Sequence, residues 1–465
     1  MKRVSVWMAS AAASLLAVPA MAGEDVESQL AEMQKAMEGL QQKVDAQEEQ
    51  LEQQGQQLKD AQRVVRADDQ DSKSGLSSFI DSIEVDGGVA GSYNFNFNTP
   101  TDGDGGTDQN SGQSGFFLPF HRDANSFQVD QIWIGLGKPA TEESRGGFRF
   151  DIFFGATASS YPTPRVDSDG DNTSRRVGFD STSDYVIDQA YVEYLAPIAD
   201  VNLKLGKFAT PVGAEVARQW SNFNITRGIV YSMMQPVNHM GVLGTVPFAG
   251  FGEFGAGVVN SGGSTISAPD DSQEKSYLAT LKLGDNRANV RGSFIFGTER
   301  VIGDSFSGSN LTTGDQLGLV DVTAWFNPTD TVSLWANYDY LFADGTGYYT
   351  HGVAVAGRVA VLPDLGLAVR GEYVREHDSA NHGALIISHD PGNVGGPAHT
   401  VDIWSLTGTV DYALTSHLKV KNELRWDRAN GSGDGDTNNQ FAENSPGDFQ
   451  SNDQLVWLIA AEYIF

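Results

Sequence analysis

The sequence predicts an all-β protein, a transmembrane antiparallel β-barrel of about sixteen strands, preceded by an N-terminal α-helical coiled coil. Three observations predict this fold. Apolar and polar residues alternate along repeated segments from residue 79 onward, the connections between these segments are alternately short and long, and a heptad pattern of apolar residues precedes them. The composition agrees, because 52 glycines and 10% aromatic residues are typical of β proteins with many turns.

Residues 1–22 have the pattern of a secretory signal peptide. Lys2 and Arg3 precede the apolar run 4–18, and an A-x-A cleavage motif ends at Ala22. A membrane helix is the alternative, but the run is too short for a hydrocarbon core of about 30 Å. The chain has no cysteine, which suits export through an oxidising periplasm.

Residues 23–65 are predicted to form a periplasmic coiled coil. Apolar residues recur along this segment at spacings of three and four, and Glu, Gln and Lys flank them. Gln47 and Gln54 occupy consecutive d positions and weaken the seam, and a single solvated helix is the alternative. The polar residues 66–78 are interpreted as a linker to the barrel, residues 79–465.

The barrel strands are expected where apolar and polar residues alternate, because successive side chains of a strand point to opposite faces. These segments are residues 82–97, 126–138, 146–157, 184–196, 199–208, 239–248, 251–260, 275–284, 286–298, 315–326, 330–342, 348–362, 365–378, 399–413, 416–429 and 452–465. The connections after the even-numbered segments are short, whereas most of those after the odd-numbered segments are long, polar and rich in Gly and Asp. This pattern is typical of an outer-membrane barrel with periplasmic turns and extracellular loops.

One face of the predicted strands carries charges, which predicts a water-filled lumen. In the segment 416–429, Leu424 and Trp426 lie on one face, while Glu423 and Arg425 lie on the other. Because unpaired ions in a dry core cost several kcal/mol, the charged face is expected to meet water. The residues expected on the lumen wall are Arg149, Asp151, Arg291, Arg358, Arg370, Glu372, Glu423 and Arg425.

The last strand carries a further signal. Counting back in twos from Phe465, every residue to Leu455 is apolar or aromatic, so this face is expected to contact lipid. A final aromatic residue preceded by alternate apolar residues resembles the signal that the outer-membrane assembly machinery recognises. We therefore expect that machinery to bind through Phe465, and we expect the chain in the outer membrane of a Gram-negative-type bacterium.

One long connection differs from the others because it is not of low complexity. It runs from Gly206 to Gly241, follows the fifth predicted strand, and is compatible with a short helix from Ala214 to Gln219. Its sequence resembles the OmpL-like β-barrel porin family and, more loosely, the phosphate-selective porins, which also carry an N-terminal coiled coil. The residues that carry this resemblance are Gly206, Lys207, Phe208, Pro211, Gly213, Glu215, Asn222, Arg227, Tyr231, Pro236 and Gly241.

The resemblance implies a homotrimeric passive channel that is narrowed by this loop, about residues 209–238. Glu215 is expected to pair with a base of the lumen and fix the loop, while Arg218 and Arg227 line the constriction and create a transverse field. The alternative is that Glu215 and Arg218 pair with each other on one helical turn. Phosphate-selective members line their pores with many Arg and Lys, whereas the inward charges here are of both signs.

Nucleic-acid binding and catalysis are not expected. The formal net charge of −29 repels a polyanion. Residues 303–305, Gly-Asp-Ser, resemble the nucleophile motif of GDS hydrolases, but no partner Asp-x-x-His occurs in the chain. The sequence therefore indicates a protein that is not an enzyme and needs no cofactor.

Two sets of residues are weak candidates for metal binding. Acidic clusters in external loops, such as Asp167, Asp169 and Asp171, could bind Ca²⁺ or Mg²⁺ and bridge to lipopolysaccharide phosphates, although they lack the spacing of an EF-hand. Histidines in and beside one loop could capture Zn²⁺ or Cu²⁺, but their spacing matches no defined site. These histidines are His377, His382, His389 and His399.

Together these features predict an outer-membrane porin that gives passive diffusion of small hydrophilic solutes and ions, in contact with outer-membrane lipid and lipopolysaccharide. The first alternative is a structural or adhesive barrel with a plugged lumen, whose acidic external loops bind divalent cations or surfaces. A barrel hydrolase is the third interpretation.

Overall fold

The computed structural model describes residues 82–98, 118–121, 124–159, 185–260, 275–298, 316–344, 347–378, 399–432, 441–442 and 449–465. The signal peptide, coiled coil and linker expected in residues 1–78 lie outside these residues. The acidic cluster of residues 167–171 and two of the candidate histidines, His382 and His389, lie outside them as well.

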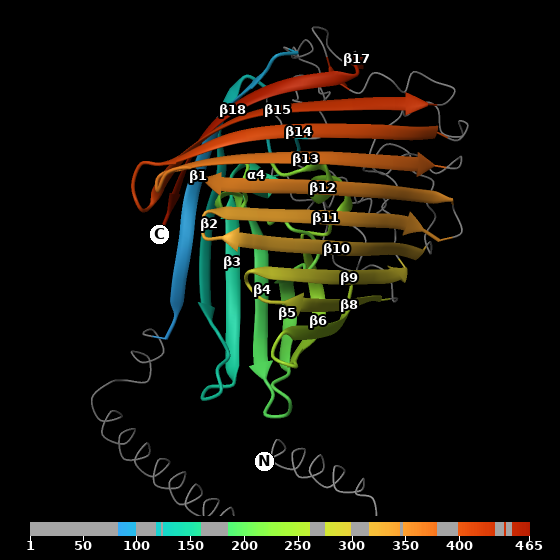
Figure 1. The fold of residues 1–465 in the computed structure, drawn as a ribbon. Helices are drawn as coiled ribbons and strands as arrows, with labels where there is room; N and C mark the ends of the chain where they lie inside the picture. The colour runs from blue at the N-terminus through green and yellow to red at the C-terminus, as the bar shows by residue number, and fades with distance from the viewer. Residues whose placement is uncertain are drawn as a thin grey trace, which may run out of the picture. The chain divides into compact units, whose positions relative to one another are not determined.

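Within the described residues, sixteen strands close into one antiparallel barrel (Figure 1). Each strand pairs with its neighbours along the chain, and β18 closes the barrel by pairing with β15 and β1. The predicted sixteen-stranded barrel is therefore confirmed. The strands are β1 (Glu84–Asn96), β2 (Ser126–Lys138), β3 (Gly146–Phe154), β4 (Tyr185–Leu195), β5 (Asn202–Ala209), β6 (Asn238–Phe248), β7 (Gly252–Val259), β8 (Ser276–Gly284), β9 (Ala288–Thr298), β10 (Gln316–Thr329), β11 (Val332–Ala343), β12 (Tyr348–Ala360), β13 (Leu365–Asp378), β14 (His399–Ala413), β15 (Leu418–Ser432) and β18 (Asp453–Ile464).

Within the described residues, three small elements lie in the long connections other than the one between β5 and β6. The helix α4 (Ala156–Ser159) follows β3, and β16 (Phe441–Ala442) and β17 (Phe449–Ser451) form a separate two-stranded sheet between β15 and β18. These elements leave the order of the barrel strands unchanged.

Short and long connections alternate around the barrel, as predicted, and the turn after β8 shows why a short one is stable. The Asp285 carboxylate accepts hydrogen bonds from the backbone N–H groups of Arg287 and Ala288, at 2.8 and 3.0 Å. These N–H groups, that of Ala288 foremost, hold the pKa of Asp285 below its ordinary value. One connection departs from the pattern, because only four residues, 344–347, separate β11 from β12 at the end where the other connections are long.

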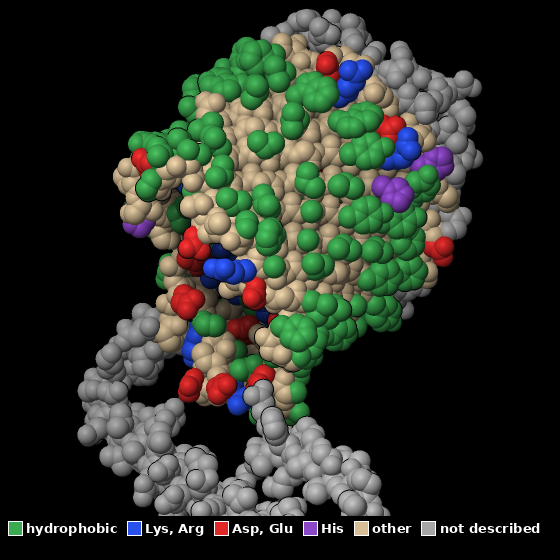
Figure 2. Space-filling model, viewed as in Figure 1, with side chains coloured by type: hydrophobic (Ala, Val, Ile, Leu, Met, Phe, Trp, Pro, Cys, Tyr) green, Lys and Arg blue, Asp and Glu red, His purple; other side chains and the backbone are tan. Residues whose placement is uncertain are grey.

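The outer face of the barrel is apolar. Large hydrophobic side chains remain exposed at alternate positions, for example Leu406 at 54% and Val410 at 43% on β14, and Figure 2 shows apolar side chains spread over this wall. On the last strand Tyr463 is exposed, as is Phe465 beyond its end, whereas Glu462 of the opposite parity is buried. The apolar parity of the last strand therefore faces outward, as predicted for a surface in lipid. Among the described residues no helix is long and apolar enough to cross a membrane.

The inner face of the barrel is polar, but much of it is covered. Arg370, Glu423 and Arg425 of the wall have 0% exposure, although the sequence predicted that these charges meet water. Residues 210–237, which connect β5 to β6, fold against these side chains. We call this segment the inner loop. Its polar groups replace water as the partners of the wall charges, which is why the ions can be buried.

Candidate pore constriction

The inner loop contacts several parts of the barrel wall, and its three anchors lie on β2, on the pair β10–β11 and on the group β13–β15. It contains two short helices, η1 (Gln219–Ser221) and α5 (Ile229–Met234). The helix that the sequence allowed from Ala214 to Gln219 does not form. The backbone N–H groups of this stretch donate to side chains of the wall and of the loop itself, so they are not available to a preceding carbonyl.

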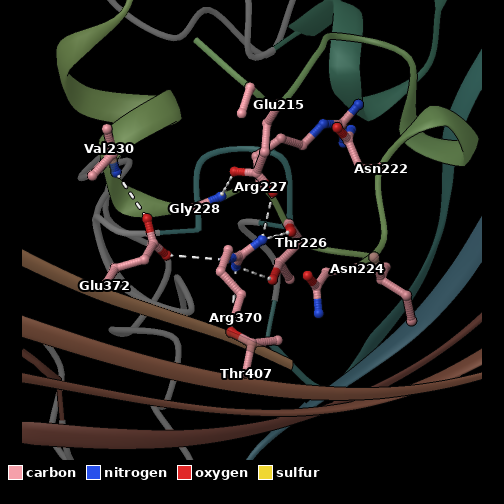
Figure 3. Close-up of polar contacts among 12 residues, drawn as sticks. Glu215, Asn222, Asn224, Thr226, Arg227, Gly228, Val230, Arg370, Glu372 and Thr407 are labelled. Carbon is pink, nitrogen blue, oxygen red and sulfur yellow. Dashed lines mark hydrogen bonds and ion pairs between the residues drawn. The ribbon is translucent and has the colours of Figure 1, made fainter. Parts of the chain in front are cut away.

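Arg370 on β13 is the centre of the first anchor of the loop (Figure 3). Its guanidinium pairs with Glu215 of the inner loop at 2.7 Å and with Glu372 of the wall at 3.1 Å, and it donates to the carbonyl of Thr226 at 2.6 Å. Burial raises the pKa of the Glu215 carboxyl, and the charge of Arg370 opposes this rise. Glu215 thus lies against a base of the lumen wall, where the sequence analysis expected it.

Two wall carboxylates receive backbone N–H groups of the inner loop. Glu423 on β15 accepts from Ile225 and Thr226 at 2.5 and 3.0 Å, and Glu372 accepts from Val230 at 3.1 Å. An irregular backbone segment inside a barrel has few partners of its own, so these bonds satisfy N–H groups that would otherwise be buried unpaired. Hydrogen bonds to charged groups contribute roughly 1.5–3 kcal/mol each.

Cations of β15 receive the carbonyls of the same segment. Lys421 donates to the carbonyl of Asn222 at 3.0 Å, and Arg425 donates to the carbonyl of Arg227 at 2.8 Å. Because alternate residues of a strand share a face, Lys421, Glu423 and Arg425 present a cation, an anion and a cation in a row. The loop backbone meets this row with a carbonyl, N–H groups and a carbonyl, which fixes its register on the wall.

A second anchor joins both ends of the inner loop to β10 and β11. The N–H of Gly213 donates to Asp321 at 3.3 Å, while the Gln235 amide donates to Asn337 and Asp339 at 2.8 and 2.7 Å. Asp321 and Asp339 are cross-strand partners, both are fully buried, and Asn337 donates to each of them. Glycine is required at position 213, where φ is +85° and a Cβ would overlap the Gln235 side chain.

A third anchor lies on β2. Gln131 accepts from the backbone N–H of Gln219 at 3.2 Å and donates to the carbonyl of Ala217 at 3.1 Å. The Gln219 side chain, also buried, donates to Asp130 at 3.0 Å. Ordering each residue of a free loop costs about 1–2 kcal/mol, and two short helices offset little of this cost. The contacts of the three anchors with the wall are therefore the main reason why the loop is ordered.

Arg218 is a part of the inner loop that stays partly open to solvent. Its side chain is 33% exposed, and its guanidinium lies 3.6 Å from Asp151 and 3.9 Å from Asp86. It also stacks on Trp133, with its Cζ atom 3.6 Å from the ring centroid. Arg149 of β3 pairs with the same two carboxylates, at 2.7 and 2.8 Å. We call Asp86, Arg149, Asp151 and Arg218 the mixed-charge cluster.

The alternative pairing of Glu215 with Arg218 is not the one in the structure. Glu215 pairs with Arg370, and the ion pairs of Arg218 are with Asp86 and Asp151. The two side chains of the loop therefore reach different parts of the wall.

Arg227, the other arginine expected at the constriction, is covered. It is 1% exposed, its guanidinium lies 4.7 Å from the ring centroid of Phe120, and it donates to the carbonyl of Ala217. Phe120 belongs to residues 118–121 of the first long connection, which pack beside the inner loop. In this arrangement Arg227 packs the loop and does not line an aqueous passage, and no local pattern in the sequence indicates that packing.

Two other predicted wall residues differ in their relation to the loop. Arg291 donates to the carbonyl of Pro211 at 3.1 Å and so holds the start of the inner loop. Arg358 forms a two-point ion pair with Asp411, at 2.7 and 2.8 Å, near the short turns. Its partner lies on the wall, so Arg358 holds β12 to β14 across the intervening strand.

The candidate metal-binding histidines are not gathered into a site in the described part of the chain. The His377 ring bonds the Thr400 hydroxyl at 2.9 Å, and the side chain of His399 lies outside the described residues. No group of three or more His, Cys, Asp or Glu side chains in the described ranges could hold a metal ion. The histidine metal site stays a prediction.

Several residues of the anchors and of the mixed-charge cluster were not expected from the sequence. They are Asp86, Asp130, Gln131, Trp133, Gln219, Gln235 and Asp321. Inward parity could have placed most of the strand residues among them in the lumen, but not both Asp130 and Gln131, which are adjacent at a register shift between β1 and β2. No periodicity relates such a position to a loop residue far away in the sequence.

Substituting Gly228 by alanine is expected to weaken the first anchor. A Cβ at this position would overlap the Glu372 carboxylate, which is held by Arg370 and by the N–H of Val230. We expect a loss of about 1–3 kcal/mol, measured as a lower temperature for the loss of heat-modifiable electrophoretic mobility. Gly371→Ala is the matched control, because a Cβ there meets nothing within 4 Å. Equal effects of the two substitutions would contradict the contact.

A family model described as "Putative beta-barrel porin-2, OmpL-like" matches residues 82–465. The chain belongs to this family. The resemblance to OmpL-like barrel porins that the inner-loop residues indicated is therefore confirmed, and the barrel is an outer-membrane barrel of porin type. No match was found among curated proteins.

Three solved structures are similar to this OmpL-like barrel at low identity. OmpT (in-vitro folded), an outer membrane protein of Vibrio cholerae, is 14% identical with a TM-score of 0.48, over 82% of this chain and 97% of that one. The outer membrane channel DcaP of Acinetobacter baumannii is 11% identical with a TM-score of 0.48, over 82% and 97%. OprB of Pseudomonas putida is 10% identical with a TM-score of 0.49, over 84% and 96%.

Proposed function

We propose that this OmpL-like barrel is a non-enzymatic channel for passive diffusion of small hydrophilic solutes and ions, narrowed by the inner loop. The observation that carries this proposal is the anchoring of the loop at three parts of the inner wall through buried polar contacts. A connection that was only a surface loop would have no reason to match its backbone to charges of the lumen. A loop held in this way sets a fixed cross-section for solutes.

The mixed-charge cluster supplies the electrostatic part of the proposal. Asp86 and Arg218 are 39% and 33% exposed, so they can act on passing ions, while Arg149 and Asp151 behind them hold the pair in place. Charges of both signs side by side give a transverse field, which orients polar solutes more than it selects anions or cations. This arrangement does not favour a phosphate-selective lining.

Planar-bilayer recording of the chain without residues 1–22 tests the channel. We expect ohmic current steps of uniform size after insertion, because a wetted lumen conducts ions in proportion to the voltage. The control is the same preparation after heat unfolding, which should give no steps. Folded, heat-modifiable barrels that insert without conducting would contradict the proposal and favour the adhesive or structural barrel with a plugged lumen.

We further propose a homotrimer with its coiled coil in the periplasm, which rests on the heptad pattern of residues 23–65 and on the family resemblance. Chemical cross-linking of the chain with and without residues 23–65 tests this proposal. A trimer band in both samples would assign the assembly to the barrel, and loss of the band in the truncated sample would assign it to the coiled coil. Monomers in both samples would contradict it.

We also propose that the outer-membrane assembly machinery recognises the chain at Phe465. The backbone of this residue is bonded to Gly87 at 3.0 and 3.1 Å, so in the folded barrel the C-terminus is already paired with β1. Recognition would therefore precede closure of the barrel. Weak Ca²⁺ or Mg²⁺ bridging by the acidic external loops stays a proposal as well.

A further inference from the structure

Polar side chains interrupt the apolar outer wall near the long-loop ends of β12, β13 and β14. Figure 2 shows histidine and charged side chains among apolar ones on this wall. The strand register places His351, Arg375 and Asp402 at one level, because His351 pairs with Arg375 and Arg375 with Asp402. His377, two residues beyond Arg375, shares its outward parity and lies one level nearer the loops. We call His351, Arg375 and His377 the outer-wall donor cluster.

Aromatic rings hold the two imidazoles in place. The ring centroids of Tyr340 and His351 are 4.7 Å apart, and those of Tyr349 and His377 are 4.9 Å apart. Aromatic side chains with a polar edge are typical of the boundary between hydrocarbon and headgroups. This part of the wall therefore lies at the outer-leaflet interface, where exposed charge costs little.

Hydrogen bonds set which nitrogen of each ring is free. The Nδ1 atom of His351 is bonded to the Tyr338 hydroxyl at 2.8 Å, and that of His377 to the Thr400 hydroxyl at 2.9 Å. When these hydroxyls donate to Nδ1, a neutral ring carries its proton on Nε2. Each histidine then presents an N–H donor on the side away from its partner.

Arg375 adds a third donor. Its Nε and Nη2 atoms bind the two oxygens of Asp402 at 2.8 and 2.9 Å, and the Tyr373 hydroxyl also bonds this carboxylate, at 2.6 Å. Both oxygens of Asp402 therefore already accept hydrogen bonds from residues of the wall. The Nη1 atom of the guanidinium bonds neither oxygen of Asp402. The Arg375 side chain is 47% exposed, so a ligand can reach this atom. With the Nε2–H tautomer of both histidines, the hydrogen-bonding atoms that this cluster offers to a ligand are N–H donors, and donors without acceptors select an anion.

We propose that the outer-wall donor cluster binds the phosphate of a phosphorylated headgroup of an outer-leaflet lipid. Guanidinium and imidazole N–H groups match phosphate oxygens, and the neighbouring Tyr340 and Tyr349 rings can pack against the sugar or acyl part of such a lipid. A second copy of this chain is a poorer occupant, because the outer wall is mainly apolar and offers few acceptors. The proposal does not depend on whether the lumen conducts.

Lipid retention tests this proposal. The chain without residues 1–22 is purified from nanodiscs of phosphatidylcholine with one-tenth diphosphorylated lipid A, and bound lipid is counted by native mass spectrometry. We expect the wild type to retain lipid A about tenfold more than the combined variant His351→Gln, Arg375→Gln and His377→Gln, since a charge-assisted bond supplies at least that factor. Arg428→Gln, on the outer wall of β15, is the matched control and should retain lipid like the wild type.

Two further arms assign the source of the phosphate. Lipid A without its phosphates should be retained no better by the wild type than by the combined variant, and inorganic phosphate at 10 times the lipid concentration should not displace lipid A. Equal retention of lipid A by both proteins, or displacement by inorganic phosphate, would overturn the assignment to a lipid. A change in oligomeric state alone would identify a subunit interface and overturn it as well. If the combined variant does not fold, the single Arg375→Gln variant takes its place.

Discussion

Replacing Arg370 by glutamine is expected to free the inner loop from β13–β15 and to increase the single-channel conductance. Arg370 is fully buried and bonds Glu215, Glu372 and the carbonyl of Thr226. Without its charge two carboxylates stay buried with no guanidinium between them, and breaking such a pair costs roughly 3–5 kcal/mol. Movement of the loop away from the wall lets water reach these carboxylates. A loop that is no longer held against β13–β15 ceases to narrow the lumen to a fixed width, so we expect the passage to widen. Bilayer recording and heat-modifiable mobility measure the two effects.

Arg358→Gln is the matched control for this prediction. Arg358 is also an arginine of the lumen wall with a two-point ion pair, but it is 30% exposed and its partner is Asp411. A partly exposed pair contributes about 1 kcal/mol or less, so we expect a small loss of stability and an unchanged conductance. Adding Glu215→Gln to the Arg370→Gln variant should restore part of the stability, because it removes one uncompensated charge. Wild-type conductance and stability of Arg370→Gln would show that this residue does not hold the loop.

The strands could be predicted from the sequence because the forces that select them are local. The alternation of residues over one strand decides which face meets lipid, and the segments predicted at 365–378 and 399–413 are the observed β13 and β14. The start of β5 was predicted at residue 199 and lies at Asn202. Ala199 and Asp200 have φ of 56° and 52° and belong to the turn, a conformation that the apolar pattern does not signal.

The anchors of the inner loop could not be predicted in the same way. Glu215 was expected to need a base, since a carboxylate inside a barrel requires a partner. The partner is Arg370, 155 positions further along the chain, and several other inward bases were equally possible from parity alone. Arg227 illustrates the same limit, because its burial depends on the position of Phe120 in another connection. These pairings follow from closure of the barrel and the path of two loops, which are not local properties.

Replacing Arg218 by glutamate is expected to make the channel cation-selective. The substitution changes the mixed-charge cluster from two cations and two carboxylates to one cation and three carboxylates. A unit charge about 4 Å from an ion contributes about 1 kcal/mol in water, which is a factor of about five. Because the substitution changes the charge by two units and acts on K⁺ and Cl⁻ in opposite directions, the K⁺/Cl⁻ permeability ratio should rise by at least about fivefold. The reversal potential in a KCl gradient measures this ratio. Conductance should change less, because Glu215 and the anchors are untouched.

Arg428→Glu separates a local field from a net-charge effect, since it makes the same change in charge on the outer wall of β15. An equal shift of reversal potential in both variants would contradict a role for Arg218 in the passage.

The salt dependence of the selectivity distinguishes an effect of the electric field of residue 218 from an effect of the width of the passage. The screening length falls from about 10 Å at 0.1 M to about 3 Å at 1 M, so a selectivity that arises from the charge of residue 218 must weaken over this range. A shift that did not weaken would have to come from the shorter side chain and a wider opening, and the mixed-charge cluster would then act on solute size and not through its field.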